Sequence, residues 1–529
     1  MLGTMRVSDP DILFINPNQL RPPVAPLALE YLGTFLRKKG YRTLLWDFCR
    51  NPRLLSDLKE NLVKVRPGLI GITFRNLDDA YLFSGRGFVP ELKNLVKEIK
   101  KSSGAPVVIG GTGFSLAPRE ILRITGADFG IWGEGEASLA QLIARLEVQR
   151  SKVKGQGEET QSSKLPSTPK GVSGREPQRG KAQRSESKNQ NLPFTFQHSP
   201  LTLDDVPGLI YRIDGGIKIN PPAFIDNLDS LGYPDWEALD VKNFFRRRRW
   251  VRLIGKDYFP ILTSRGCPYS CSYCEAFRIT GRKVRRHSIE YVLGWIEKLH
   301  RDYGIKYFSV SDDAFTQDRE YVISLCREIL KRGLDIKWDC GSNAIRFDRI
   351  DPEMLHLMER AGCFYVTVAI ESGSERILKE MNRRSDLKAV RTGIELIKRE
   401  TRMAVGAFFI LGYPTETRED ILRTIRLARS LPIDAPQFFL FTPHPGTPVL
   451  DKMVADKKIN LEDWDHYNYY RPSIPLSDVS LTGLKLYQAY AYISFFLRPR
   501  PLRKIVIRYV RDLSDFSTLT RFLSRIVKG

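Results

Sequence analysis

Residues 265–274 read RGCPYSCSYC and place three cysteines, Cys267, Cys271 and Cys274, in the spacing C-x3-C-x2-C. Thiolates are the usual ligands of iron–sulfur clusters, and three of them can hold three corners of a cubane [4Fe–4S] cluster. The next cysteine, Cys326, lies far along the chain, so one iron would stay open for a substrate-like ligand. The spacing differs from the paired C-x2-C motifs of zinc sites. The alternative, three unrelated core cysteines, does not explain their concentration in one loop.

This stretch resembles the signature of the radical S-adenosylmethionine (SAM) superfamily, including the aromatic Tyr273 before the third cysteine. The resemblance implies that the three cysteines hold the cluster and that SAM chelates the fourth iron. In that family the reduced cluster cleaves SAM to methionine and a 5′-deoxyadenosyl radical. The cofactor then carries the chemistry and the protein positions it. Tyr273 is therefore a candidate catalytic residue.

The composition limits the class of protein. A length of 529 residues predicts two to four domains. The net charge of +22 suits a nucleic acid, an anionic membrane surface or an anionic substrate, and does not distinguish them. We find no signal peptide and no apolar stretch of the roughly 18 to 20 residues that span a bilayer. An oxygen-sensitive cluster and few cysteines predict a reducing cytoplasm rather than a disulfide scaffold.

Apolar runs alternate with helical patterns over residues 8–146, which predicts a doubly wound parallel sheet. The expected strands are 11–16, 42–47, 69–74, 106–110 and 129–132. Ligands of such sheets bind at the carboxyl ends of the strands. Three loops follow strands there, at 16–26, 75–79 and 110–115.

The order of motifs from NP at residues 16–17 through GGTGFSLAPREIL to GADFGIWGEGE resembles the cobalamin-binding domain that precedes many radical SAM cores. The resemblance implies a flavodoxin-like sheet for residues 8–146 and cobalamin as a further cofactor. The candidate cobalamin-binding residues are Asn16, Arg75, Asn76, Gly110, Gly111, Gly113, Ser115 and Glu134.

One departure from that pattern concerns the cobalt. Many cobalamin domains carry D-x-H-x-x-G, whose histidine binds cobalt from below, but this chain has no histidine before His198. Arg75 follows the third expected strand, and resemblance to the tryptophan C-methylase type implies an arginine near cobalt. Because a guanidinium does not ligate cobalt, Arg75 is a candidate catalytic residue that disfavours a lower ligand. The alternative is a surface arginine in a salt bridge.

Two segments link this domain to the next. Residues 147–200 are a basic insertion, rich in Lys, Arg, Ser, Gln, Gly and Pro, which predicts disorder. Residues 201–255 are a connecting segment with a hairpin turn at Asp214, Gly215 and Gly216. Its run FFRRRRW at 244–250 either lines an anionic site or is a solvated linker.

Residues 256–450 contain six strand–helix repeats, which predict a partial (βα)6 barrel with its site at the carboxyl face. Polar and glycine residues follow these strands, and the radical SAM resemblance implies that they contact SAM. The candidates are Asp312, Asp313, Asn343, Glu371, Ser372, Phe409, Gly412 and Glu416. Their alternative role is strand-end capping. His444 is a candidate for facing substrate, although a lone histidine is more often structural.

Residues 451–529 are expected to form a small helical C-terminal domain. Residues 501–529 hold two basic amphipathic segments, which either lie on an anionic membrane or dock on the barrel. We therefore expect a cytoplasmic protein, with peripheral membrane contact as the open alternative.

Together these resemblances imply a cobalamin-dependent radical SAM enzyme, in the first place a methyltransferase at an unactivated carbon of a small-molecule or lipid-like substrate. An external electron donor, flavodoxin or ferredoxin, is implied. Cyclisation or rearrangement, and methyl transfer by a polar route, stay open. A tRNA methylthiotransferase would carry three N-terminal cysteines, whereas only Cys49 precedes Cys267, so no dedicated nucleic-acid partner is expected. The intact cysteine triplet argues against a non-catalytic binding protein.

Overall fold

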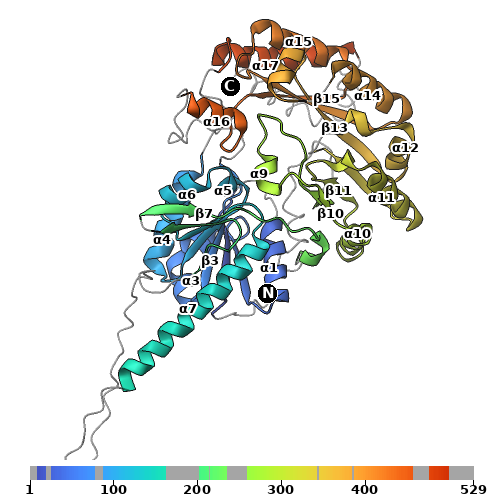
Figure 1. The fold of residues 1–529 in the computed structure, drawn as a ribbon. Helices are drawn as coiled ribbons and strands as arrows, with labels where there is room; N and C mark the ends of the chain where they lie inside the picture. The colour runs from blue at the N-terminus through green and yellow to red at the C-terminus, as the bar shows by residue number, and fades with distance from the viewer. Residues whose placement is uncertain are drawn as a thin grey trace, which may run out of the picture.

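The computed structural model describes residues 9–19, 26–77, 87–162, 202–213, 215–234, 259–341, 345–383, 386–456 and 476–499, without the side chains of 151–162 and 348. These residues form two α/β domains, each built around a largely parallel sheet, as the sequence predicts (Figure 1). The basic run at 244–250 and the amphipathic segments at 501–529 lie outside the described residues.

The N-terminal sheet has the strand order β2-β1-β3-β4-β5-β6-β7, and its first five strands are parallel. Its strands are β1 (Ile12–Asn16), β2 (Thr43–Asp47), β3 (Leu69–Thr73), β4 (Val107–Gly110), β5 (Phe129–Ile131), β6 (Leu209–Ile213) and β7 (Gly216–Ile219). Near-continuous apolar sequence is typical of parallel strands that are buried on both faces. The order 2-1-3-4-5 is the flavodoxin-like order, which confirms the prediction. The connecting segment adds β6 and β7 as an antiparallel hairpin at the sheet edge.

Helices cover both faces of this sheet. One hydrophobic cluster includes α3 (Leu58–Val65), α4 (Val89–Ser102) and α6 (Pro118–Thr125), and the other includes α1 (Leu27–Lys38) and α7 (Glu136–Ser162). Figure 1 shows α7 projecting away from the domain. This helix continues to Ser162, into the stretch from residue 147 that the composition predicts to be disordered. Its Gln, Glu, Lys and Arg residues are good helix formers, and they outweigh the polar composition.

The second sheet has the order β15-β14-β13-β12-β11-β8, and all its strand pairs are parallel. Its strands are β8 (Phe259–Ile261), β11 (Tyr307–Val310), β12 (Lys337–Cys340), β13 (Cys363–Glu371), β14 (Ala404–Leu411) and β15 (Ala435–Leu440). Within the described part of the chain the end strands β15 and β8 are not paired with each other. The six strands therefore form the partial barrel that the repeats predict.

The helices of this domain begin at capping side chains. Five helices that connect its strands start at a Ser, Thr or Asp side chain that accepts a backbone N–H of the first turn, which satisfies an otherwise unpaired donor. They are α10 (Ile289–Tyr303), α11 (Arg319–Lys331), α12 (Pro352–Arg360), α14 (Leu387–Glu400) and α15 (Arg418–Ser430). The short helix α13 (Glu375–Glu380) lies between β13 and α14 in the chain.

The final described helix, α17 (Leu481–Phe496), packs on β15 and α15 and confirms the helical prediction for this stretch. Its Gln488 Nε2 donates to Phe438 O at 2.7 Å, and the Phe438 N–H donates to the Tyr492 hydroxyl at 3.1 Å. None of the helices in the described ranges is long and apolar enough to cross a membrane.

Gly412 allows a close approach of α17 to the end of β14. It has a φ of +88°, and a Cβ there would lie 2.6 Å from Leu484 Cδ1. Gly412→Ala should therefore lower stability by about 1–3 kcal/mol through strain and overpacking. Gly215→Ala is the matched control, because Gly215 has a φ of +76° but nothing within 4 Å of the added Cβ. Thermal unfolding should show the larger loss for Gly412→Ala, and equal losses would contradict this packing argument.

Candidate functional site

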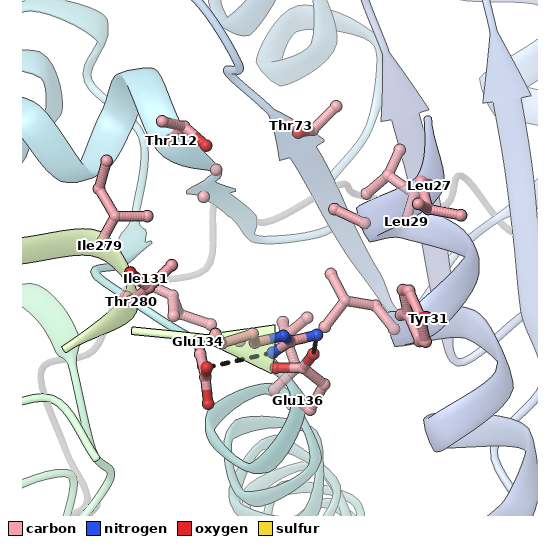
Figure 2. Close-up of a pocket in the computed structure, with 18 of the residues that line it drawn as sticks. Leu27, Leu29, Tyr31, Thr73, Thr112, Ile131, Glu134, Glu136, Ile279 and Thr280 are labelled. Carbon is pink, nitrogen blue, oxygen red and sulfur yellow. Dashed lines mark hydrogen bonds and ion pairs between the residues drawn. The ribbon is translucent and has the colours of Figure 1, made fainter. Parts of the chain in front are cut away.

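A first cavity of about 310 Å³ lies between the carboxyl edge of the N-terminal sheet and the start of the second domain (Figure 2). The N-terminal domain contributes Leu27 and Tyr31 of α1, the glycine-rich turn 110–112 and the turn 133–136. The second domain contributes Arg265, Ile279, Thr280 and Asp313. Both domains are therefore needed to form this cavity.

Buried ion pairs hold the two walls together. Arg265 lies 3.2 Å from Glu134 and 3.0 Å from Glu136, and Figure 2 shows both carboxylates beside the cavity. Arg285 lies 2.8 Å from Glu134, whose side chain is only 6% exposed. Burial alone would raise the pKa of Glu134, but the hydrogen bond from Arg285 and the charge of Arg265 outweigh it, so the pKa is lowered. The carboxylate is therefore held in its charged form.

A second interdomain contact fixes the helix that follows the cysteines, α9 (Ala276–Thr280). Trp132 Nε1 donates to Arg278 O of α9 at 2.9 Å. Gly208, next to this tryptophan, has a φ of +63°, and a Cβ there would lie 2.3 Å from Trp132 O. The close approach of the Gly208 and Trp132 backbones therefore helps to position Trp132 against α9.

A second cavity of about 430 Å³ contains the predicted cluster site. Cys267, Cys271 and Cys274 all line it, together with Tyr273 and Glu371. Among the described residues, no group of three or more His, Cys, Asp or Glu side chains converges on a single-ion site. A four-iron cluster is larger than one ion and separates its thiolate ligands more widely, and the cavity gives it space beside all three thiols.

Backbone hydrogen bonds brace the cysteine loop against later parts of the chain. The Cys267 N–H donates to Gly281 O at 3.0 Å, and the Ser272 N–H donates to Met381 O at 2.9 Å. Gly266 has a φ of +102°, and a Cβ there would lie 2.2 Å from Lys283 O. The glycine before the first cysteine is thus required by the turn.

Glu371 is aimed into the second cavity at the end of β13. Its φ of +70° is rare for a residue with a side chain, and the register of β13 against β14 shifts between Ala369 and Glu371. The Tyr273 hydroxyl donates to Glu371 Oε1 at 2.9 Å. Burial raises the pKa of Glu371.

The predicted cobalamin residues divide between two cavities. Gly110, Gly111 and Glu134 line the first cavity. The other lining candidates border a third cavity of about 540 Å³ on the α3–α4 side; they are Asn16, Arg75 and Asn76. Thr73, at the end of β3, lines both cavities.

Two predicted cobalamin residues line neither cavity and have structural contacts. A Cβ at Gly113 would lie 3.0 Å from Phe74 O, so the glycine allows close packing of the turn. Ser115 Oγ donates to Gly111 O at 3.0 Å and accepts from Gly133 N at 3.2 Å. This serine therefore joins the two glycine turns that border the first cavity.

Of the seven predicted SAM residues that the structure describes, two line the second cavity, Asp313 and Glu371. Asp312 is fully buried and accepts hydrogen bonds from Thr263 and Ser264, which join β8 to β11. Ser372 is also buried and pairs with Thr424 at 3.2 Å. These contacts match the capping alternative rather than a cavity position.

The strand β14 presents different residues from those expected. Phe408 and Ile410 line the cavity, whereas Phe409 is fully buried and stacks on Phe438 with ring centroids 5.1 Å apart. Neighbouring side chains of a strand point to opposite faces, so the candidate should be shifted by one residue. Glu416 accepts from the Gly412 and Tyr413 N–H groups, outside this cavity. Asn343 lies outside the described residues.

Several cavity residues were not identified from the sequence. Tyr269, Arg346 and Arg383 line the second cavity without having been candidates, whereas His444, which lines it too, was one. Asp313 borders both the first and the second cavity, so the two meet at this carboxylate. Thr280, which lines the first cavity, donates to Asp313 Oδ2 at 2.7 Å. Neither Arg346 nor Arg383 belongs to a recognisable sequence motif. Arg383 is identified only by its proximity to the cysteine loop in the folded structure.

Comparisons with known proteins agree with this architecture. The radical SAM superfamily matches residues 261–428, and the B12 binding domain matches residues 18–143. An uncharacterized methyltransferase of Pyrococcus horikoshii is 27% identical and covers 92% of this chain and 90% of its own length. An anaerobic magnesium-protoporphyrin IX monomethyl ester cyclase of Rubrivivax gelatinosus is 22% identical over 87% of this chain and 73% of its own. The radical SAM methyltransferase TsrM of Kitasatospora setae, solved with cobalamin and [4Fe-4S] cluster bound, shares the fold with a TM-score of 0.64, at 22% identity over 84% of this chain and 78% of its own.

Two α/β domains that share the first cavity, next to a second cavity lined by three cysteines, define the class together with these matches. The chain belongs to the B12-binding radical SAM family and is a cobalamin-dependent radical SAM enzyme. Its cofactors are a [4Fe–4S] cluster, SAM and cobalamin, and such enzymes need a reductant. The residues present fit these groups. The three thiols border the second cavity, where the cluster would bind. The first cavity lies over Gly110 and Gly111, which have no side chains and leave space for cobalamin.

Removing the central carboxylate of the interdomain network should destabilise the protein. Glu134→Gln leaves Arg265 and Arg285 without their shared charge, which costs about 3–5 kcal/mol for a buried pair. Because folding lowers its pKa, Glu134 contributes stability above its ordinary value of 4.5 and loses it as the pH falls. Asp226→Asn is the control, since the Asp226–Lys283 pair is 75% exposed on each side. Thermal unfolding between pH 3.5 and 7 checks this, and equal effects of the two variants would contradict it.

Glu416 should give the opposite pH dependence. Burial raises its pKa to about 8 from the ordinary 4.5, so the folded protein holds a proton that the unfolded chain releases. Stability should then fall as the pH rises from about 4.5 to about 8. Glu416→Gln should remove this fall. Because one pKa unit corresponds to about 1.4 kcal/mol, the wild-type free energy of unfolding should drop by more than about 1 kcal/mol over this pH range relative to that of the variant. Thermal unfolding between pH 5 and 8 measures it. The exposed Glu419→Gln variant should keep the wild-type slope.

Proposed function

We propose that this enzyme is a methyltransferase that transfers a methyl group to an unactivated carbon of a small-molecule or lipid-like substrate. The observation that supports it is the meeting of two cavities at Asp313, one bordered by the B12-type domain and the other by the three cysteines. When bound, the cluster with SAM supplies a carbon radical and cobalamin supplies a methyl group. A substrate at this junction borders both. The Pyrococcus horikoshii relative, which is called a methyltransferase, adds support.

In this proposal the residues of the chain bind and orient the cluster and SAM. Cys267, Cys271 and Cys274 hold the cluster. Glu371 and Asp313 accept hydrogen bonds from the ammonium or ribose hydroxyls of SAM, and Tyr273 fixes the Glu371 carboxylate through their 2.9 Å hydrogen bond. Glu371 is buried and Asp313 is half-buried, so an unpaired donor of the ligand is a favourable partner for them.

In this proposal residues of the first and third cavities, which share Thr73, would hold cobalamin. Gly110 and Gly111 have no side chain, which leaves the edge of β4 open to a flat ring. Arg75 and Asn16 line the third cavity and contact the cofactor from that side. Arg75 is the proposed group beside the cofactor, and its guanidinium would not ligate cobalt.

A ring-forming or rearranging enzyme is the second candidate. The observation that favours it is the Rubrivivax gelatinosus relative, named a cyclase, which aligns with 87% of this chain. Both candidates use the same cluster site. They differ in whether the methyl group of SAM leaves with a product. An external flavodoxin or ferredoxin is the proposed electron donor in either case.

The test is reconstitution under anaerobic conditions with iron, sulfide, cobalamin and SAM carrying a labelled methyl group. Methyl transfer predicts bound cobalamin, label recovered with it, and both S-adenosylhomocysteine and 5′-deoxyadenosine. Cys271→Ala should lower 5′-deoxyadenosine formation at least 100-fold, because one cluster ligand is lost. Cobalamin should stay bound to this variant. S-adenosylhomocysteine alone would favour the polar route. 5′-Deoxyadenosine without label on cobalamin would favour the cyclase, and a cluster without cobalamin binding would falsify the methyltransferase proposal.

A further inference from the structure

Arg383 brings a guanidinium to the middle cysteine of the cluster loop. Its Nη1 donates to Cys271 Sγ at 3.9 Å, and its Nη2 donates to Ala369 O at 2.8 Å. Its Nε is buried and has no hydrogen-bond partner among the described residues. The guanidinium therefore lies between the end of β13 and the loop, on the wall of the second cavity.

The backbone around Arg383 is built against the cysteine loop. Met381 O accepts from Ser272 N at 2.9 Å, and Asn382 Nδ2 donates to Ser270 O at 2.8 Å. Asn382 has a φ of +48°, a conformation that asparagine tolerates better than most residues. The Arg383 N–H donates to Leu378 O at 2.8 Å, which anchors it to α13. Three consecutive residues thus fix the loop and the position of the cation.

We propose that Arg383 raises the reduction potential of the cluster by donating a charge-assisted hydrogen bond to the Cys271 thiolate. Reduction adds negative charge to a centre that three thiolates already make anionic. Hydrogen bonds to the sulfurs and nearby net charge are among the factors that set the potential of an iron–sulfur cluster. A guanidinium keeps its charge at every relevant pH and forms strong bonds to anions.

The surroundings make this cation important. Glu275, Asp313 and Glu371 line the same cavity, and an ionised carboxylate there disfavours an added electron. Arg383 offsets that effect at a thiol itself. Its role is to tune the cluster, not to touch substrate. The inference rests on the proposed cluster site and is independent of whether a methyl group is transferred.

The experiment is a redox titration of the reconstituted full-length protein without SAM, followed by electron paramagnetic resonance of the reduced cluster. Arg383→Gln should lower the equilibrium constant for reduction at least tenfold, which corresponds to about 59 mV toward more negative potential. Arg383→Lys keeps the charge but loses the fixed fork, and should shift less. Arg376→Gln is the matched control, because it removes an arginine of α13 that pairs with Glu380 and Asp420 instead. Its cluster should keep the wild-type potential.

Iron and sulfide analysis comes first, because it separates two kinds of failure. A wild-type protein without a cluster would overturn the proposed cluster site and this inference together. Clusters with unchanged potentials in both Arg383 variants would overturn the inference alone. If only Arg383→Gln fails to assemble a cluster, the reduction potential of the Arg383→Lys variant tests the inference. Loss of the cluster from both variants would show that Arg383 builds the loop and would also contradict a tuning role.

Discussion

The buried carboxylate of Glu134 is the interaction on which the rest of the site depends. It belongs to the N-terminal domain, yet both of its partners, Arg265 and Arg285, come from the second domain. A charge removed from water must be paired, so the two domains cannot separate or slide here without a large cost. Since Arg265 comes two residues before Cys267, this pairing also fixes where the cysteine loop begins.

The second constraint is the direction of the parallel strands. In both sheets the residues that border the cavities follow the carboxyl ends, as the βα connection requires. Thr73 and Gly110 end two strands of one sheet, and Ser311 follows a strand of the other; all three line the first cavity. Because the ion pairs set these two edges against each other, the carboxylate of Asp313 comes to border both cavities. The shared junction is therefore a consequence of topology rather than of any single motif.

Sequence reasoning succeeded where the signal was local and failed where it depended on orientation. Apolar runs and their spacing predicted both sheets, and three closely spaced cysteines predicted one wall of the second cavity. It could not distinguish Asp312 from Asp313, or Phe408 from Phe409, because neighbouring side chains of an extended chain point to opposite sides. Which side faces the cavity is decided by packing between distant elements. Arg383 had no signal at all, since its contact with the loop joins residues 112 positions apart.

The backbone is strained at Glu371, at the end of β13, where the side chain lines the second cavity. On β14 the side chain of Phe409 faces the core, and Glu371 is its register partner. Ala369 and Glu371 nevertheless both line the second cavity, as two residues at alternate positions of an extended strand should. The register shift inserts one extra residue between them, so the ladder pairs Glu371 with core-facing Phe409 although the carboxylate faces the cavity. The positive φ that follows costs of order 1–3 kcal/mol. Such a cost persists only where the surrounding structure enforces it, and the hydrogen bond from Tyr273 of the cysteine loop, together with the bulge, does so here.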